Sequence, residues 1–326
     1  MLKRFTGLSI AIIAMAFLAS GVGATNSGSL WSYLFGGIST DQREILTNIR
    51  LPRIATALLA GFLIGIAGAV MQRTFANSLA EPTLLGTTAA AAFGSVIAVL
   101  LVGTSSASSI AILSAFLAAL TISFLTIQLD KKARVRGSNL IIVGIAFAAL
   151  LNGAIALVAV IAQNEEIRAM SFWSSGTLAF ANKETVLSLL AFTVLVIIAI
   201  PKLRNILDIF ILDDIQLTLT GRSPIKLKSA ALVMVSLAVA ATTTSVGAVA
   251  FLGLAAPYVS RFLFGSSMKL ALLGSGLTGA LLLLISDTVA RSIAAPYELP
   301  ISVVTSLIGA PFLLFLVMRK RGGRNA

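Results

Sequence analysis

Apolar runs long enough to cross a lipid bilayer alternate with short polar stretches along the whole chain. About 20 apolar residues in a helix span a hydrocarbon core of roughly 30 Å. Backbone N–H and C=O groups in lipid must be paired within the segment itself, which favours helices for these runs. The strands of a membrane barrel would alternate apolar and polar residues, and these runs do not. The pattern therefore predicts an all-α integral membrane protein.

We expect about ten transmembrane helices within a single transmembrane domain, residues 1–326. The expected spans are 5–24, 54–72, 86–103, 107–129, 139–162, 185–200, 229–252, 253–264, 270–290 and 300–318. The first run could instead be a cleaved signal peptide, because Val22-Gly23-Ala24 resembles a cleavage site. The polar stretch 25–53 contains Trp31 and Tyr33, which are typical of a segment lying at the membrane interface.

The basic residues test the number of spans and their orientation. With ten spans, 18 of the 24 Lys and Arg residues fall on the side that carries both termini. The other six are Arg43, Arg50, Arg53, Arg168, Lys183 and Arg291. Cytoplasmic loops of membrane proteins are enriched in Lys and Arg, so both termini are expected in the cytoplasm. Omitting the short span 253–264, which contains Pro257, would reverse every later loop.

Composition narrows the class of function. Hydrophobic residues make up 58% and charged residues 11%, and the mean hydropathy is +1.01. Cysteine and histidine are both absent, which excludes thiolate chemistry and removes the commonest general base and metal ligand. No GxxxxGK[ST] phosphate loop is present, so we expect no ATP hydrolysis by this chain. The net charge of +12 fits cytoplasmic loops, and no nucleic-acid-binding signature accompanies it. We therefore expect neither an enzyme, nor a metal site, nor a nucleic-acid partner.

The charges also bear on the energy source of a transporter. Ion-coupled transporters usually carry ionisable residues within their spans. Here Glu81 and Asp287 are the candidates, and both lie near span ends, where a helix-terminus partner is the simpler interpretation. Energy is therefore expected from a partner of this chain.

The insert 201–228 is the best candidate for docking such a partner. Acidic and basic side chains surround the apolar run Ile209-Phe-Ile-Leu212, which a fully solvated loop would not need. Gly221 followed by Arg222 indicates a helix end. The candidate docking residues are Asp208, Phe210, Asp213, Asp214, Leu219, Gly221 and Arg222. The alternative is a plain interfacial helix.

On the opposite side, Arg50 and Arg53 bracket Leu51-Pro52, and Arg291 follows span 270–290. These guanidinium groups could extend to the membrane interface, or they could pair with carboxylates of an external partner, because the guanidinium fork binds carboxylates bidentately. In the second case, reversing their charges should abolish function without affecting the cytoplasmic partner.

Several ordered blocks resemble the FecCD-type permeases of binding-protein-dependent ABC importers, over nearly the whole chain. The blocks are Arg50-Leu-Pro-Arg53, Gly68-Ala-Val-Met-Gln72, Asn77-Ser-Leu-Ala-Glu-Pro82, Leu84-Leu-Gly86, Trp173-x-x-Gly176, Gly247 to Leu254 with Pro257 and Arg261, Asp287-x-x-x-Arg291, Glu298-Leu-Pro300 and Gly309-Ala-Pro-Phe312. Gln72, Asn77, Pro82, Gly86, Pro257 and Arg261 are the expected structural motif residues. The chain departs from the family at Ser78, where the family has proline, and at Tyr258, where it has histidine.

The resemblance implies the permease subunit of an importer in the cytoplasmic membrane, most simply for an iron–siderophore complex. It implies two ATPase subunits holding ATP and Mg²⁺ on the 201–228 insert, and a second permease, identical or paralogous. It also implies an extracytoplasmic binding protein that offers Glu residues to Arg50, Arg53 and Arg291, and an inner gate near Gly137 and Ser138. No cofactor is expected on this chain. Haem and cobalamin are alternative cargoes, and an ion-coupled secondary transporter or a non-transport membrane scaffold are alternative functions.

Overall fold

The computed structural model describes residues 2–22, 29–37, 39–103, 109–133, 138–162, 176–210, 212, 214–265, 267–295 and 297–322. In this part of the chain every regular element is a helix. Seven helical segments are long and apolar enough to cross a membrane, and three shorter apolar helices accompany them at 87–102, 252–264 and 301–312. The predicted all-α membrane architecture is therefore confirmed, with these ten segments close to the ten expected runs.

The helices follow one another with short connections. They are α1 (Leu2–Gly21), α2 (Leu30–Phe35), α3 (Thr40–Ile45), the π-helix η1 (Leu46–Arg50), α4 (Leu51–Thr74), the 3-10 helix η2 (Pro82–Leu85), α5 (Thr87–Val102), α6 (Ser109–Ala133), α7 (Ser138–Ile161), α9 (Lys183–Ile209), α10 (Asp214–Leu219), α11 (Pro224–Val246), α12 (Leu252–Phe264), α13 (Met268–Ile293) and α14 (Ile301–Gly322).

Two boundaries differ substantially from the sequence prediction. Residues 40–53, expected in a polar interfacial stretch, continue directly into α4 through η1, because Ser39 and Gln42 form a capping box that starts the helix. Helix α9 continues through Pro201 to Ile209, nine residues beyond the expected span. A proline removes a single backbone donor, and a helix can retain its course when its other backbone bonds are made.

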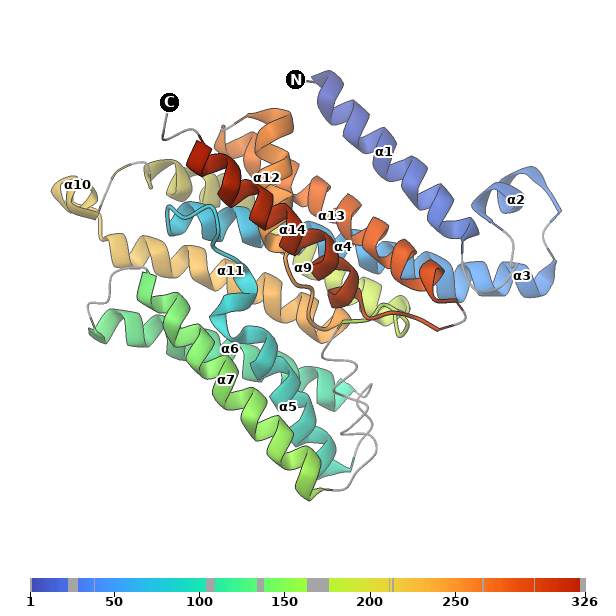
Figure 1. The fold of residues 1–326 in the computed structure, drawn as a ribbon, viewed down its shortest axis with the longest axis horizontal. Helices are drawn as coiled ribbons and strands as arrows, with labels where there is room; N and C mark the ends of the chain where they lie inside the picture. Colours follow the sequence, from blue (N-terminus) through green and yellow to red (C-terminus); the bar gives the residue numbers. More distant parts are fainter. Residues whose placement is uncertain are drawn as a thin grey trace.

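Helix α4 is the central helix of the bundle and packs against α9, α11, α12 and α13 (Figure 1). Three glycines allow this packing: a Cβ atom on Gly61, Gly65 or Gly68 would collide with a backbone carbonyl of α13 or α12. Helices in lipid associate through close packing of small residues, without a hydrophobic driving force between them. The Gly61-x-x-x-Gly65 spacing therefore marks a tight helix crossing, as its sequence indicates.

The molecule has two distinct ends. The short helix α10 lies at one end, and α2 and α3 lie at the other (Figure 1). Helices α5, α6 and α7 pack together beside the central bundle, with α6 against α11. Apolar side chains such as Leu150 and Val160 on α7 are exposed, as expected where a helix faces lipid or another membrane subunit.

Candidate functional site

Arg53 forms the centre of a charged cluster at the α2–α3 end. Its Nη2 and Nε atoms donate to Asp287 Oδ1 of α13 at 2.8 and 3.0 Å. Its Nη1 and Nη2 atoms also donate to Glu298 Oε1 and Oε2 at 2.8 and 3.0 Å. Asp287 is fully buried, whereas the Glu298 side chain is 39% exposed. One guanidinium group therefore joins α4, α13 and the segment before α14.

Arg50 and Arg291 bind the end of α1. Arg291 donates from Nη2 to the Ala19 carbonyl at 2.6 Å and from Nη1 to the Val22 carbonyl at 2.7 Å. Arg50 donates to the Ser20 carbonyl. The last carbonyls of a helix lack intrahelical partners and carry partial negative charge, so cations there are favourable. The two arginines cap α1 and attach it to α4 and α13.

The structure thus brings together the three arginines proposed to meet an external partner, but it turns them inward. Arg50, Arg53 and Arg291 are only 5%, 8% and 6% exposed. Their partners are groups of this chain, and in this conformation they do not present a basic surface. Direct docking on them stays a prediction, and it would require carboxylates of the partner to replace Glu298 or the α1 carbonyls.

At the α10 end, two adjacent residues of α4 contact two different helices. Gln72 donates from Nε2 to the Leu254 carbonyl of α12 at 3.3 Å and accepts from Arg261 Nη1 at 2.8 Å. Arg73 donates from Nε to the Leu207 carbonyl in the last turn of α9 at 3.1 Å. The expected motif residues Gln72 and Arg261 therefore form a direct pair.

The remaining motif residues shape the connection from α4 to α5. The Asn77 side chain accepts from the Leu79 amide at 2.9 Å, which closes a turn. Pro82 packs against Gly253, where a Cβ atom would clash with the proline ring. Gly86 has a φ of 77°, a conformation that favours glycine, at the start of α5. Pro257 is buried within α12.

Glu81 lies in the same connection, outside the membrane-spanning helices. Burial raises the pKa of its carboxyl to about 7, although the Phe251 amide and the Thr83 hydroxyl donate to it and oppose this shift. Phe251 has a φ of 60°, which is uncommon for a residue with a side chain. Glu81 therefore binds the break between α11 and α12.

The predicted docking segment, 208–222, combines buried and exposed apolar residues. Phe210 is buried against the core, whereas Leu219 of α10 is 82% exposed. Asp208 pairs with Arg204 at 3.3 Å on the protein surface. Gly221 has a φ of 75°, and the Arg222 amide returns to the Leu217 carbonyl, which ends α10 as the sequence indicated.

Some predicted residues lie outside this description. Asp213 and Gly137 are outside the described residues, and the side chains of Asp214 and Ser138, which begin α10 and α7, are outside them too. The gate prediction therefore stays a prediction. Over the residues that the structure describes, no group of three or more carboxylate, histidine or cysteine side chains could hold a metal ion.

Sequence reasoning missed three roles. Arg73 was counted only as one basic residue of a loop. Asp287 was interpreted as a helix-terminus partner, and Glu298 only as part of a motif. The i, i+4 spacing of Asp287 and Arg291 signals their contact, which measures 3.5 Å between Oδ2 and Nε. No local signal identifies the other two, because Arg53 and Glu298 are 245 residues apart and Arg73 and Leu207 are 134 residues apart.

The apolar helices, the tightly crossing α4 and the interrupted α11–α12 pair define a multi-pass integral membrane protein. The model of the FecCD transport family matches residues 8–319. The chain belongs to the FecCD transport family, whose members are transport permeases and not enzymes, and it resides in the cytoplasmic membrane.

Individual relatives agree with this assignment. The Probable iron chelatin transport system permease protein of Helicobacter pylori is 35% identical over 280 residues, covering 85% of this chain and 83% of that protein. The hemin transport system permease protein HmuU of Yersinia pestis is 31% identical, covering 98% and 97%. A metal-chelate type ABC transporter solved in an inward-facing conformation superposes with a TM-score of 0.84 at 28% identity, covering 98% of this chain and all of that one. The chain is therefore an ABC importer permease, among relatives named for several different cargoes.

Proposed function

We propose that this chain moves an iron–siderophore complex across the cytoplasmic membrane, using ATP that a separate subunit hydrolyses. Its ten spans leave both termini in the cytoplasm, and two permease subunits, identical or paralogous, enclose the path. The observation that carries the proposal is α10, a short helix at one end of the bundle that exposes Ile215 and Leu219 within a charged segment. Exposed apolar residues rimmed by charges are typical of a protein–protein contact.

The proposed mechanism is alternating access. Two ATPase subunits, which carry ATP and Mg²⁺, bind the 208–222 segment of each permease and move it when they close. The movement reaches the bundle through α9 and α11, the helices on either side of α10. An extracytoplasmic binding protein supplies the affinity for the cargo, so this chain needs no cofactor and no tight binding site.

The outer arginines enter this proposal in a modified form. Because Arg50, Arg53 and Arg291 are buried, reversing their charges would leave carboxylates facing Asp287 and the α1 carbonyls. Such a variant would lose its fold, and loss of uptake would not demonstrate docking. Glu298 is the exposed member of the cluster, and it is where a carboxylate of the binding protein would first compete for Arg53.

The proposal is tested by uptake into proteoliposomes that contain the permease, its ATPase and its binding protein. Ferric siderophores, haemin and cobalamin are supplied in parallel, and ATP-dependent accumulation of a ferric siderophore is expected. Accumulation of only haemin or cobalamin would contradict the cargo, and uptake driven by an ion gradient without the ATPase would contradict the mechanism.

The docking surface is tested by Leu219→Asp. A charge at this exposed apolar position should weaken binding of the ATPase by more than about tenfold, measured by co-purification and titration. Leu34→Asp is the matched control, because Leu34 is an exposed leucine on α2 at the opposite end. Equal ATPase binding by both variants would rule out α10 as the docking helix.

A further inference from the structure

Arg73 occupies a place between the proposed ATPase-docking segment and the core of the permease. It lies in the last turn of α4, is half-buried, and donates from Nε to the Leu207 carbonyl at 3.1 Å. Leu207 is fully buried in the last turn of α9, immediately before Asp208, the first residue of the docking segment. The contact therefore lies at the point where α9 meets the segment that the ATPase would move.

The neighbouring residue continues the connection. Gln72 binds Leu254 and Arg261 of α12, so two consecutive residues of α4 attach α9 on one side and α12 on the other. Consecutive residues of an α-helix point about 100° apart, which allows this division. A displacement of the end of α9 can thus reach α12 through the end of α4.

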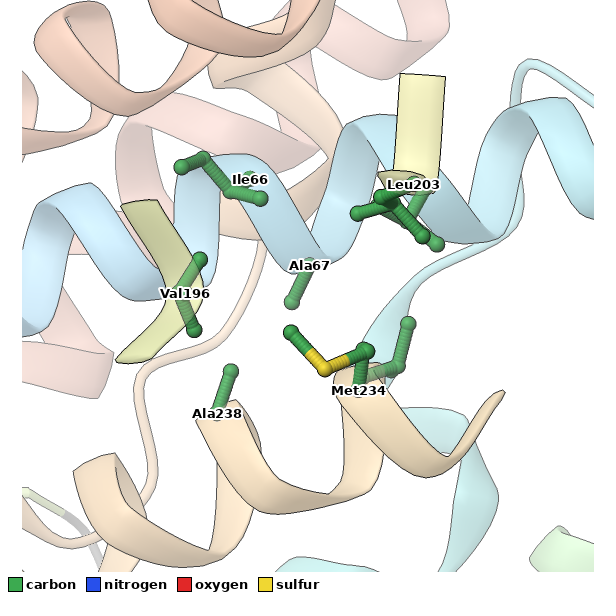
Figure 2. A pocket seen from close by; sticks show the side chains of 8 residues that line it. Ile66, Ala67, Val196, Leu203, Met234 and Ala238 are labelled. Atoms are coloured by element: carbon green, nitrogen blue, oxygen red, sulfur yellow. The ribbon is translucent and has the colours of Figure 1, made fainter. Parts of the chain in front are cut away.

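The apolar packing beside this contact is incomplete. A small cavity lies between α4, α9 and α11, lined by Ile66, Ala67 and Val70, by Val196 and Leu203, and by Met234, Val235 and Ala238 (Figure 2). Val70 and Leu203 precede Arg73 and Leu207 by about one helical turn. Atoms across a gap lose their dispersion contacts, so the close fit of α4 to α9 is weakest beside the cavity. The hydrogen bond of Arg73 is therefore placed where side-chain packing alone holds the two helices least.

The chemistry of the contact favours arginine. A charged donor forms a stronger hydrogen bond than a neutral one, and the last turn of a helix presents carbonyls with partial negative charge. The guanidinium group holds its donors in a fixed plane, which gives this bond a direction that a lysine would not reproduce.

We propose that Arg73 is a positioning residue that couples movement of the ATPase-docking segment to the α4–α12 core. The inference rests on the proposed function, because it assumes that the ATPase acts on residues 208–222. It concerns a different quantity, however: the amount of cargo moved for each ATP hydrolysed. A residue needed only for folding would change the yield of active transporter and leave this ratio unchanged.

The test uses the complete transporter in proteoliposomes and measures cargo uptake and ATP hydrolysis together. Arg73→Met keeps the length of the side chain and removes the donors. We expect uptake to fall about tenfold, the loss that corresponds to one charge-assisted hydrogen bond, while the ATPase rate stays within about twofold. Lys202→Met is the control, because Lys202 is an exposed basic residue on the same helix as Leu207, and its ratio should match the wild type.

Each result is decisive. An unchanged ratio of uptake to hydrolysis in Arg73→Met, with a working wild-type transporter, overturns the role of Arg73 and leaves the proposed function intact. Absence of ATP-driven uptake in the wild type overturns the proposed function itself. If Arg73→Met does not assemble, Arg73→Gln, whose shorter amide does not reach the Leu207 carbonyl, replaces it, and a wild-type ratio in that variant also overturns the inference.

Discussion

Asp287 concentrates the electrostatics of the outer end on one fully buried carboxylate. It accepts from Arg53 and lies 3.5 Å from the Arg291 guanidinium group, so it faces two cations. Removing a buried ion from its partners costs more than the pair contributes, because the remaining charge is left without compensation. A side chain that looks like a helix-terminus partner is thus the element that holds two buried arginines in place.

We therefore expect Asp287→Asn to lower the free energy of unfolding by about 3–5 kcal/mol. Chemical or thermal unfolding of the purified permease in detergent measures this loss. Glu298→Gln is the comparison, because the half-exposed Glu298 pairs with the same arginine and should contribute about 1 kcal/mol. Equal losses in the two variants would contradict the central role of Asp287.

At the scale of elements, the crossing of α4 and α13 depends on the absence of side chains. Gly61 meets Gly279, and Gly65 meets Ser275, with backbone against backbone. Ridges of larger side chains would separate the two helices and also the contacts that α4 makes with α9 and α12. Helix position, and not only helix stability, is therefore set by these glycines.

Gly65→Ala should accordingly destabilise the permease by about 1–3 kcal/mol, because its methyl group would overlap the Ser275 carbonyl. Gly153→Ala on α7 is the matched control, since nothing lies within 4 Å of the position of its Cβ atom. In the control, alanine should be neutral or slightly stabilising. Melting temperatures of both variants in the same detergent provide the measurement, and similar destabilisation of the two would refute a tight crossing at Gly65.

At the scale of the whole molecule, the transmembrane pattern could be predicted and the contacts between helices could not. Span boundaries followed from apolar runs, and even the short α12 agreed with its expected limits to within one residue. The extension of α9 past Pro201 was missed, because a proline usually marks a helix boundary in sequence. The inward orientation of Arg50 and Arg53 was missed for a different reason: their partners lie on α1, α13 and the segment before α14, and no local pattern connects them.

The topology allows a direct measurement, because the chain contains no cysteine. Single cysteines are introduced by Trp31→Cys on α2 and Leu219→Cys on α10, two exposed positions at opposite ends. A membrane-impermeant maleimide should label the first only from outside the cell and the second only in inverted vesicles. Labelling of both positions from the same side would contradict the proposed orientation.

The caps of α1 have a consequence for biosynthesis. The first helix to leave the ribosome ends in carbonyls whose donors include Arg291, which is 269 and 272 residues away from the two residues whose carbonyls it binds. Throughout most of translation, that helix terminus has to rely on water or lipid headgroups at the membrane surface. Its final attachment waits for α13, so the assembly of the permease is completed at the helix with which its synthesis began.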